Sequence, residues 1–478
     1  MRLFLTLPII IIFLALLTNN VICKNSNKKN KFSYNTKLAS QSFDYYINDT
    51  VNPCEDFYTF ACGKMNGKKK VNTDSDGRVK IIQSEYYFRD FYQDVKRGVY
   101  DRDSKAIKKI SLMRKKCNDI DKLYLDDCIK TVDVFGYYAF AAHYAKLLND
   151  ELSEYKWLDV VTETFNQLKS QLKRMVKQRK RLLDRKTKAN YLLKIEQMSL
   201  GIGKLFKEKS KCRSYMEQCY EYFKFSRKDD VLNMLQNIRN YEFMLPDKDK
   251  QFKEMCLNYI KKSKSGDLRL EDLLYSHTFY LHEQNKLIVN PSIFNSLCYN
   301  PRYPESLNYG CAGFIIGHEM LHAFDSEGIY LNKDGKENLE ITSSFTKRMF
   351  EKRKKCYKDK YGKNSNVMLT LDEDVSDNGG IKIAFESHLK YCKNFKNKDS
   401  LIPKFEKYTH DQLFFINAAR SICSTPANVN VNLYDNDFES SRKKFRVYKV
   451  MSNYKSFSRA FQCGHGTNMN SKHKCRVW

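Results

Sequence analysis

Two histidines four residues apart, with a glutamate beside the first, are the residues of this sequence best suited to chemistry. They are His318, Glu319 and His322 in the stretch FIIGHEMLHAFDSEG. On a helix, positions i and i+4 lie on one face, so both imidazoles would project together and bind one zinc ion. Glu319 would stand beside that ion, placed to take a proton from a zinc-bound water. The pattern predicts a zinc hydrolase centre rather than two histidines packed in a core helix.

A zinc centre of this kind needs a third protein ligand and keeps one coordination position for water. A histidine six residues after His322 would supply it in one class of enzymes, but that position is Gly328. The other solution is a glutamate on a second helix. The stretch LDEDVSDNGGIKIAF offers Glu373, 51 residues after His322. We therefore expect His318, His322 and Glu373 to bind one zinc ion per chain.

Two aspartates are suited to orient the imidazoles by accepting their second ring N–H. Asp377 follows Glu373 by four residues and would share its helix face. Asp325 follows His322 by three residues. We expect Asp377 to support catalysis in this way. We expect Asp325 to accept a hydrogen bond from a ligand histidine without contacting the metal itself.

The elements that carry these residues are predicted to be mainly helical. Residues 311–325 and 342–359 are expected to form helices, and a third helix begins near Asp374. Residues 80–275 repeat apolar side chains with a period near 3.6 and contain few Gly or Pro. The stretch 281–294 is expected to be extended. The predicted fold class is mainly α with a small β-sheet beside the zinc helix.

The N-terminus has the pattern of a secretory signal. One arginine precedes an apolar run from Leu3 to Leu17, and Val21 and Cys23 occupy the −3 and −1 positions of a cleavage site. The run is shorter than the roughly 20 residues that cross a bilayer. We expect 1–23 to be a removed signal peptide, with an uncleaved membrane anchor as the less favoured alternative. The polar, basic stretch 24–42 is expected to be a flexible leader.

The remaining composition is consistent with a secreted, extracellular protein. Of fifteen cysteines, Cys23 would leave with the signal peptide, and the even number that remains favours disulfides. Asn48-Asp49-Thr50 is a glycosylation sequon, so Asn48 is a candidate acceptor. No later segment is long and apolar enough to predict a stable membrane span. No pattern in the chain predicts an oligomeric state.

The net charge of +28 raises the possibility of a polyanionic partner. No nucleic-acid-binding module is present, so we expect no nucleic acid partner. The densest basic run, Lys169 to Lys188, has apolar residues at roughly helical spacing. It is interpreted as the solvated face of an amphipathic helix. A role of this face in binding anionic surfaces is kept as a minor alternative.

Several stretches resemble the neprilysin family of zinc endopeptidases, family M13. They are SLNYGCAGFIIGHEMLHAFDSEGIYLNKDG, EDVSDNGG, the terminal CRVW and the early VNPCEDFYTFACGKMNG. The resemblance implies a two-lobed gluzincin metallopeptidase with a thermolysin-like zinc helix. It divides the chain into an N-terminal helical region, 43–275, and a C-terminal catalytic domain, 276–478.

The resemblance also implies disulfide pairs that spacing alone could not assign. The implied pairs are Cys54–Cys463, Cys62–Cys423, Cys117–Cys128 and Cys356–Cys475. The resemblance leaves six cysteines without assigned partners: Cys212, Cys219, Cys256, Cys298, Cys311 and Cys392.

Family members cut peptides on the amino side of hydrophobic residues, and the resemblance carries this expectation to the present chain. The stretch HTFY resembles the strand that binds the substrate backbone, with His277 in place of an asparagine and Thr278 after it. Arg446 resembles a substrate-binding arginine. Arg78 loosely matches an arginine that meets the substrate's C-terminal carboxylate.

Three departures from the family motivate an alternative function. The helical region is much shorter than usual between Cys117 and Cys128, and His277 replaces the asparagine. The position of a histidine that stabilises the reacting substrate falls near Glu439 or Ser440, and neither residue can replace it. The alternative is therefore a catalytically impaired peptide-binding protein that retains zinc.

Overall fold

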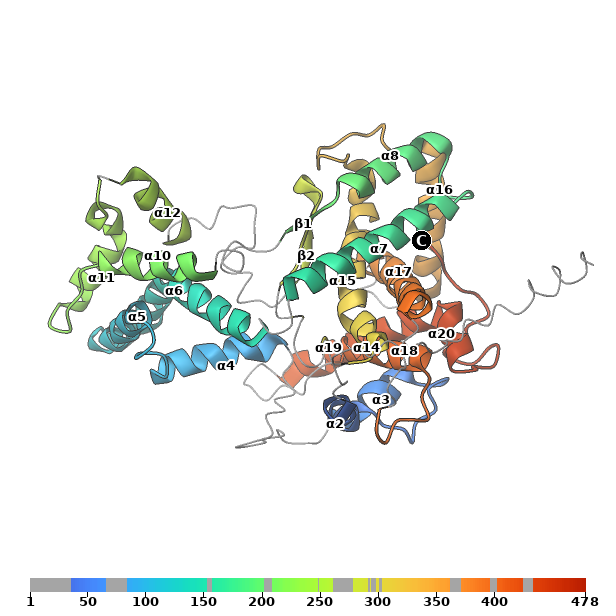
Figure 1. Ribbon diagram of the computed structural model, residues 1–478, viewed down its shortest axis with the longest axis horizontal. Helices are drawn as coiled ribbons and strands as arrows, with labels where there is room; N and C mark the ends of the chain where they lie inside the picture. The colour runs from blue at the N-terminus through green and yellow to red at the C-terminus, as the bar shows by residue number, and fades with distance from the viewer. Residues whose placement is uncertain are drawn as a thin grey trace, which may run out of the picture.

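The computed structural model describes most of the chain as helices with one small sheet (Figure 1). The described residues are 36–65, 84–152, 157–201, 209–247, 249–260, 278–290, 293, 298–300, 303–361, 371–395, 402–423 and 433–478. The predicted fold class is confirmed. Within these ranges no helix is long and apolar enough to cross a membrane. The predicted signal peptide lies outside them.

One group of helices gathers on one side of the molecule in Figure 1 and is called the helical lobe here. Its longest helix, α6 (Leu125–Leu152), packs against each of the other helices in the group. Two disulfides, Cys117–Cys128 and Cys219–Cys256, lie within it. Its helices are α4 (Ser84–Arg97), α5 (Lys105–Lys116), α6 (Leu125–Leu152), α10 (Lys209–Glu221), α11 (Val231–Arg239) and α12 (Lys250–Ile260).

The other helices and the sheet form the larger lobe, which is built from both ends of the chain and from residues 157–201. The predicted boundary at 275/276 remains a division of the sequence, since it does not separate the two lobes in space. The helices of the larger lobe are α2 (Thr36–Tyr46), α3 (Phe57–Cys62), α7 (Trp157–Gln178), α8 (Arg185–Gln197), α14 (Glu305–Asn308), α15 (Phe314–Leu321), α16 (Ser344–Tyr361), α17 (Leu371–Phe395), α18 (His410–Arg420), α19 (Leu433–Ser452) and α20 (Lys455–Ala460).

Helix α7 belongs to the larger lobe because its apolar stripe has a partner there. Trp157, Phe165 and Leu172 are buried on this stripe, and the helix packs against α8 and α17. The N-terminal segment also packs into this lobe. Helix α2 buries Phe43, whose ring lies 5.5 Å from that of Phe405. The expected flexible leader 24–42 is therefore helical from Thr36 onward, because this aromatic contact holds the helix in place.

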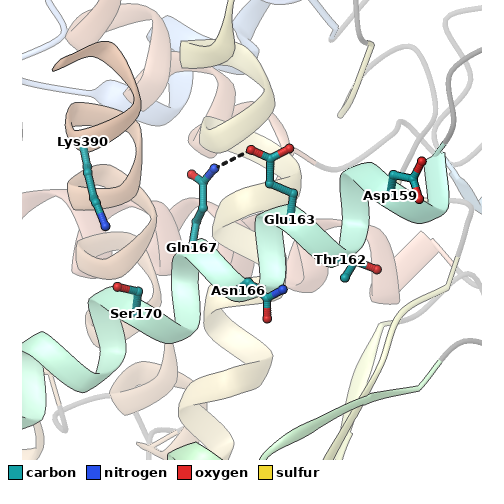
Figure 2. A pocket seen from close by; sticks show the side chains of 7 residues that line it. All are labelled: Asp159, Thr162, Glu163, Asn166, Gln167, Ser170 and Lys390. Atoms are coloured by element: carbon teal, nitrogen blue, oxygen red, sulfur yellow. Dashed lines mark hydrogen bonds between the residues drawn. The ribbon is translucent and has the colours of Figure 1, made fainter. Parts of the chain in front are cut away.

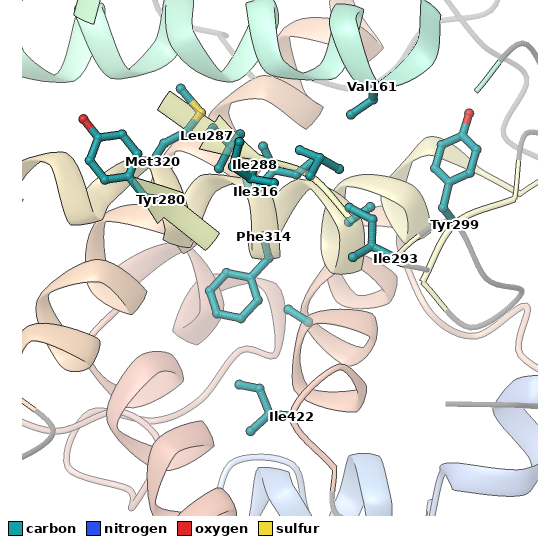
Figure 3. Close-up of a cluster of buried hydrophobic side chains, with 14 of the residues drawn as sticks. Val161, Tyr280, Leu287, Ile288, Ile293, Tyr299, Phe314, Ile316, Met320 and Ile422 are labelled. Carbon is teal, nitrogen blue, oxygen red and sulfur yellow. The ribbon is translucent and has the colours of Figure 1, made fainter. Parts of the chain in front are cut away.

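The sheet has three short strands in the order β1-β3-β2: β1 (Ser199–Gly201), β3 (Lys286–Ile288) and β2 (Phe279–Leu281). Strand β3 pairs in parallel with β1 and antiparallel with β2, so β2 is an edge strand of this sheet. One face of the sheet packs on α15. Figure 3 shows Leu287 and Ile288 of β3 in one buried cluster with Ile316 and Met320 of α15. The sheet thus covers one side of the helix that carries the two histidines.

Helices α15 and α17 pack unusually closely because glycines lie between them. A Cβ atom added at Gly380 would lie 2.6 Å from the backbone nitrogen of His318. A Cβ at Gly379 would lie 2.5 Å from Leu321 Cγ, and one at Gly317 would lie 3.0 Å from the carbonyl oxygen of Gly380. Any side chain at these positions would separate the two helices. The DNGG stretch of the sequence therefore sets the distance between them.

Four disulfides hold distant segments of the larger lobe together or close a loop within it. They are Cys54–Cys463, Cys62–Cys423, Cys298–Cys311 and Cys356–Cys475. All four pairs implied by the family resemblance are thus present in the structure, together with two that the resemblance left unassigned. The side chains of Cys212 and Cys392 lie outside the described residues.

Asp184 joins the start of α8 to the start of α16. Its carboxylate accepts hydrogen bonds from the backbone nitrogen of Thr187 at 3.0 Å and from the Thr187 hydroxyl at 2.7 Å. It also accepts from the hydroxyls of Thr346, at 2.9 Å, and Ser343. These donors hold the pKa of Asp184 below its usual range, although partial burial opposes the shift.

We predict that Asp184→Ala lowers the free energy of unfolding of the larger lobe by about 2 kcal/mol or more, because it removes a helix cap and leaves three hydroxyls without their acceptor. Urea unfolding followed by tryptophan fluorescence reports this lobe, which contains both tryptophans, Trp157 and Trp478. The matched control is Asp334→Ala, an exposed turn position of the same lobe, which should change stability by less than about 0.5 kcal/mol. Equal effects of both changes would contradict the role of Asp184.

Candidate zinc centre

The two histidines of the motif meet at the C-terminal end of α15. The helix is buried nearly all round, and a π-helical turn, Tyr309–Gly313, leads into it. His318 lies in the helix, and His322 begins the 3₁₀ turn that follows. Their Nε2 atoms are 3.2 Å apart. The two imidazoles therefore converge on one point, as the spacing predicted.

Glu373 reaches the same point from the first turn of α17. Its carboxylate oxygens lie 3.2 Å from Nε2 of His318 and 3.6 Å from Nε2 of His322. The donor atoms of these three residues all lie within 4.8 Å of one another. A tetrahedral zinc ion with bonds of about 2.0–2.1 Å holds its ligand atoms about 3.3 Å apart. Two nitrogens and one carboxylate at these separations fit zinc.

Each imidazole has an aspartate behind it. His318 Nδ1 lies 2.8 Å from Asp377 Oδ1, and His322 Nδ1 lies 2.8 Å from Asp325 Oδ2. A carboxylate can only accept, so both Nδ1 atoms donate, and each Nε2 is left to offer its lone pair to a metal at the shared point once that nitrogen carries no proton. The structure thus brings Asp377 and Asp325 to the positions that the sequence suggested, and it pairs each with one histidine.

The carboxylates dominate the protonation of His318. Burial alone disfavours the imidazolium, but the charge and hydrogen bond of Asp377 outweigh it and raise the pKa of His318 to about 10. The partner carboxylates respond in the opposite direction: burial would raise the pKa values of Asp377 and Asp325, but their cationic and N–H partners hold both below the usual range. Metal binding must therefore displace a proton from His318 at neutral pH.

Glu319 stands beside the three candidate ligands without joining them. Its carboxylate oxygens lie 3.9 Å from Nε2 of His318 and 4.0 Å from Nε2 of His322. Burial raises the pKa of Glu319, so its carboxylate is a stronger base than an exposed one. Glu373 is half-exposed, so solvent reaches the centre from that side. The arrangement places a base next to the open face of a metal site.

Helix α19 supplies two cations that hold the start of α17. Arg446 donates from Nε and Nη2 to the two oxygens of Asp377, both at 2.8 Å. Lys449 forms a buried ion pair with Asp374. The predicted substrate-binding Arg446 is thus also a partner of the aspartate that orients His318, while its side chain stays 37% exposed. The sequence did not indicate this second role.

Two residues behind the centre escaped the sequence reasoning. His282 Nε2 lies 2.9 Å from the carbonyl oxygen of His322 and therefore donates to it. Buried Lys194 of α8 donates to the carbonyl oxygens of Ala323, at 2.9 Å, and Gly328, at 2.7 Å. Burial lowers the pKa of Lys194 to about 7. Both residues are distant in sequence from the motif, and no spacing rule connects them to it.

The other predicted substrate contacts are only partly described. Thr278 is buried and precedes the edge strand β2, which packs against α15. His277 and Arg78 lie outside the described residues, as do the side chains of Glu439 and Ser440 in α19. Asn48 is partly exposed, and its amide oxygen accepts from the Thr50 hydroxyl at 2.7 Å. Its glycosylation stays a prediction.

A short zinc helix with two histidines, an adjacent glutamate and a third ligand from a second helix defines a gluzincin-type metallopeptidase centre. Residues 277–477 match the model of Peptidase family M13. This part of the chain is therefore a neprilysin-like Peptidase family M13 domain. The match includes every residue of the centre.

Known proteins resemble different portions of the chain. Neprilysin of Oryctolagus cuniculus is 30% identical over 271 residues, which are 52% of this chain and 36% of that protein. The chain thus spans about a third of that relative. The structure of Mycobacterium tuberculosis zinc metalloprotease ZMP1 with inhibitor has a TM-score of 0.51 at 17% identity, over 70% of this chain and 48% of that one.

A second similar structure matches nearly the whole chain. The Haemonchus galactose containing glycoprotein complex has a TM-score of 0.64 at 15% identity, over 94% of this chain and 100% of that one. At such identities the two structures show a shared fold and nothing more. The fold of the present chain is thus shared with that protein over nearly all of both chains.

We predict that Gly380→Ala weakens zinc binding by about tenfold or more, because the added methyl group would push His318 away from Glu373. Competition with a chromophoric chelator measures the affinity. Gly464→Ala is the matched control, since its Cβ would find no neighbour nearer than 3.7 Å. Unchanged affinity in Gly380→Ala would show that α15 and α17 tolerate a wider separation.

We predict that Asp325→Asn weakens zinc binding by about 10- to 100-fold. Asp325 also accepts from the backbone nitrogens of Glu327, at 3.0 Å, and Gly328, at 2.8 Å. An asparagine cannot accept from all three donors, because one of its two atoms is itself a donor. The same competition assay applies, with exposed Asp334→Asn as the control. Equal affinities in the two variants would exclude an orienting role.

Proposed function

We propose that this protein is a zinc-dependent endopeptidase that hydrolyses oligopeptides, with one zinc ion per chain. The observation that carries the proposal is the position of Glu319, whose carboxylate lies about 4 Å from the imidazole nitrogens of both histidines. A purely structural zinc site is usually closed by four protein ligands. Here three ligands and an adjacent base leave a face open for substrate, which is the arrangement of a hydrolytic site.

The protein's own groups divide the work of hydrolysis. His318, His322 and Glu373 would hold zinc, which would supply Lewis acidity toward a peptide carbonyl and toward water. Glu319 takes the proton from the attacking water and returns it to the leaving amine. Asp377 keeps the imidazole of His318 in the tautomer that presents Nε2 to the metal. Asp325 does the same for His322.

The edge strand β2 is the surface that we propose binds the peptide backbone. Its outer edge has no strand partner in the described part of the sheet, and it packs beside α15. An extended peptide can add to such an edge by main-chain hydrogen bonds. Arg446, with Thr278 and His277, would contact the substrate there. Cleavage on the amino side of hydrophobic residues follows from the family and is part of the proposal.

The alternative is a peptide-binding protein that retains zinc but cleaves poorly. It rests on the sequence at Glu439 and Ser440, where the family has a histidine that stabilises the reacting substrate. Arg446 weakens this alternative. Its side chain is partly exposed, and its charge acts on the carboxylates of Glu319 and Glu373, so it is close enough to the site to contact a substrate. Secretion, through removal of 1–23, is proposed for either function.

We predict that Glu319→Gln abolishes peptide cleavage, with at least about a 10²-fold loss of kcat/KM, while zinc content stays at one ion per chain. The loss follows because glutamine cannot accept the proton of the attacking water. Cleavage of a quenched fluorescent peptide library measures the activity, and elemental analysis measures the zinc. A chelator should abolish peptide cleavage by the wild type, and added zinc should restore that cleavage.

The outcomes separate the two functions. Cleavage by the wild type alone establishes the peptidase and reports its sequence preference. If wild type and Glu319→Gln are folded, contain zinc and bind peptides equally but cleave none, the binding protein is the correct interpretation. Cleavage that survives in Glu319→Gln would remove Glu319 from the mechanism.

A further inference from the structure

A cavity of about 500 Å³ lies in the larger lobe, and none of the candidate zinc ligands lines it. It is formed by the C-terminal half of α7, the middle of α17 and the segment that follows α19. Its residues on α17, Lys382 to Glu386, lie more than two helical turns beyond Glu373. The cavity is therefore distinct from the proposed catalytic site.

The cavity is strongly basic. Arg174 comes from α7 and Arg179 directly follows that helix, while Lys455, Arg459 and Arg476 come from the C-terminal part of the chain. Glu386 is the one carboxylate among the residues that line it, and it lies 4.0 Å from Arg174. Such a distance between two half-exposed side chains gives a weak ion pair. The positive charge is thus mostly unbalanced inside a concave site, where fields are focused.

Arg179 is the unusual member of this group. It is 8% exposed, yet its Nε has no hydrogen-bond partner among the described residues. Burial, and then the charges of Arg476 and Arg353, lower the pKa of Arg179 to about 10. A buried guanidinium without an anion is costly, and most buried polar atoms in proteins are paired. The prediction that the Lys169–Lys188 run is a solvated face is therefore wrong at Arg179.

Two other basic side chains of the cavity have hydrogen-bond acceptors within the protein. Lys382 donates to Asn378 Oδ1 at 2.6 Å and to the carbonyl oxygen of Trp478. Lys474 donates to the carbonyl oxygen of Ser452 at 2.6 Å and to the Ser458 hydroxyl at 3.1 Å. These two residues build the wall of the cavity, and Arg179 is left as the buried cation that lacks a partner for Nε.

The opposite half of the same helix shows the contrast. The pocket in Figure 2 runs along the N-terminal half of α7, where Asp159 and Glu163 are acidic and Lys390 of α17 is the one cation of its lining. The Gln167 amide there donates to Glu163 at 3.0 Å. Basic charge therefore collects at one end of α7 and in one cavity, rather than along the whole helix.

We propose that the basic cavity binds a small molecule that carries two or more phosphate or sulfate groups. Guanidinium groups match the oxygens of these tetrahedral anions with paired hydrogen bonds. Three arginines besides Arg174 line the site, so a single charge would leave the field unbalanced. The volume is in the range of ordinary small-molecule sites. Bound oxyanion would supply the acceptor that Arg179 Nε lacks.

The test is calorimetric titration of the zinc-loaded full chain with sucrose octasulfate and, separately, with inositol hexakisphosphate. We expect saturable binding to a single site. Arg179→Gln and Arg476→Gln should each weaken it by about tenfold, the effect of losing one charge-assisted hydrogen bond. Arg102→Gln, an exposed arginine of the helical lobe, makes the same charge change and should leave affinity within about twofold. Thermal melting checks that each variant is folded.

The two ligands distinguish the sources of the anion. Arginine-dependent binding of the sulfated sugar alone supports a sulfated saccharide, and binding of the inositol phosphate alone supports a phosphorylated metabolite. Arg476 is exposed, so Arg476→Gln keeps the test decisive even if Arg179→Gln fails to fold. Absence of binding by both ligands, or an equal loss in Arg102→Gln, would overturn the proposal.

Discussion

The close contact between α15 and α17 is the constraint on which the rest of this structure depends. Three glycines at the contact allow the backbone of one helix to approach the other within ordinary van der Waals distance. Only at this separation can a glutamate in the first turn of α17 reach two histidines at the end of α15. The sheet, α7 and α19 then pack around the pair and fix it. The candidate zinc centre is thus a property of one helix–helix interface.

Charge is arranged around that interface in alternating layers. The imidazoles of His318 and His322 face the metal position, aspartates lie behind them, and Arg446 lies behind one of these aspartates. Each charged group offsets the free-energy cost of burying the group in front of it, because a buried charge is stable only when it is paired and hydrogen-bonded. Lys449 and Asp374 form a second such pair between α19 and α17. Residues that do not reach the shared point therefore contribute to the position of the three candidate ligands.

The larger lobe is assembled from both ends of the chain, and disulfide bonds connect these ends. Cys54–Cys463 and Cys62–Cys423 connect the first described helices to the C-terminal part, and Cys356–Cys475 holds the final segment against α16. The same final segment forms a wall of the basic cavity. The helical lobe, short as it is, packs around α6 with two disulfides of its own. Each lobe is thus packed around its own helices and held by its own disulfides.

The sequence by itself determined the local parts of this protein. The spacing of His318 and His322 requires only one helix, the apolar periodicity requires only a core to pack against, and both were predictable for that reason. Glu373 could be proposed as the third ligand only because the histidine motif requires one. The disulfide pairs needed the family resemblance, because no local rule connects residues so far apart. The tertiary structure alone decided which aspartate orients which histidine, and it placed His282 and Lys194 behind the centre.

The burial of individual charged side chains is the other property that could not be predicted from the sequence pattern. The basic run Lys169–Lys188 has the composition of a solvated face, but Arg179, which directly follows α7, is buried in a cavity that α17 and the C-terminal segment also line. Arg446 likewise could be matched to a substrate contact by position, but its pairing with Asp377 depends on how α19 packs against α17. The physical reason is the same in each case. Hydrogen bonds and ion pairs form between neighbours in space, and the packing of helices chooses those neighbours.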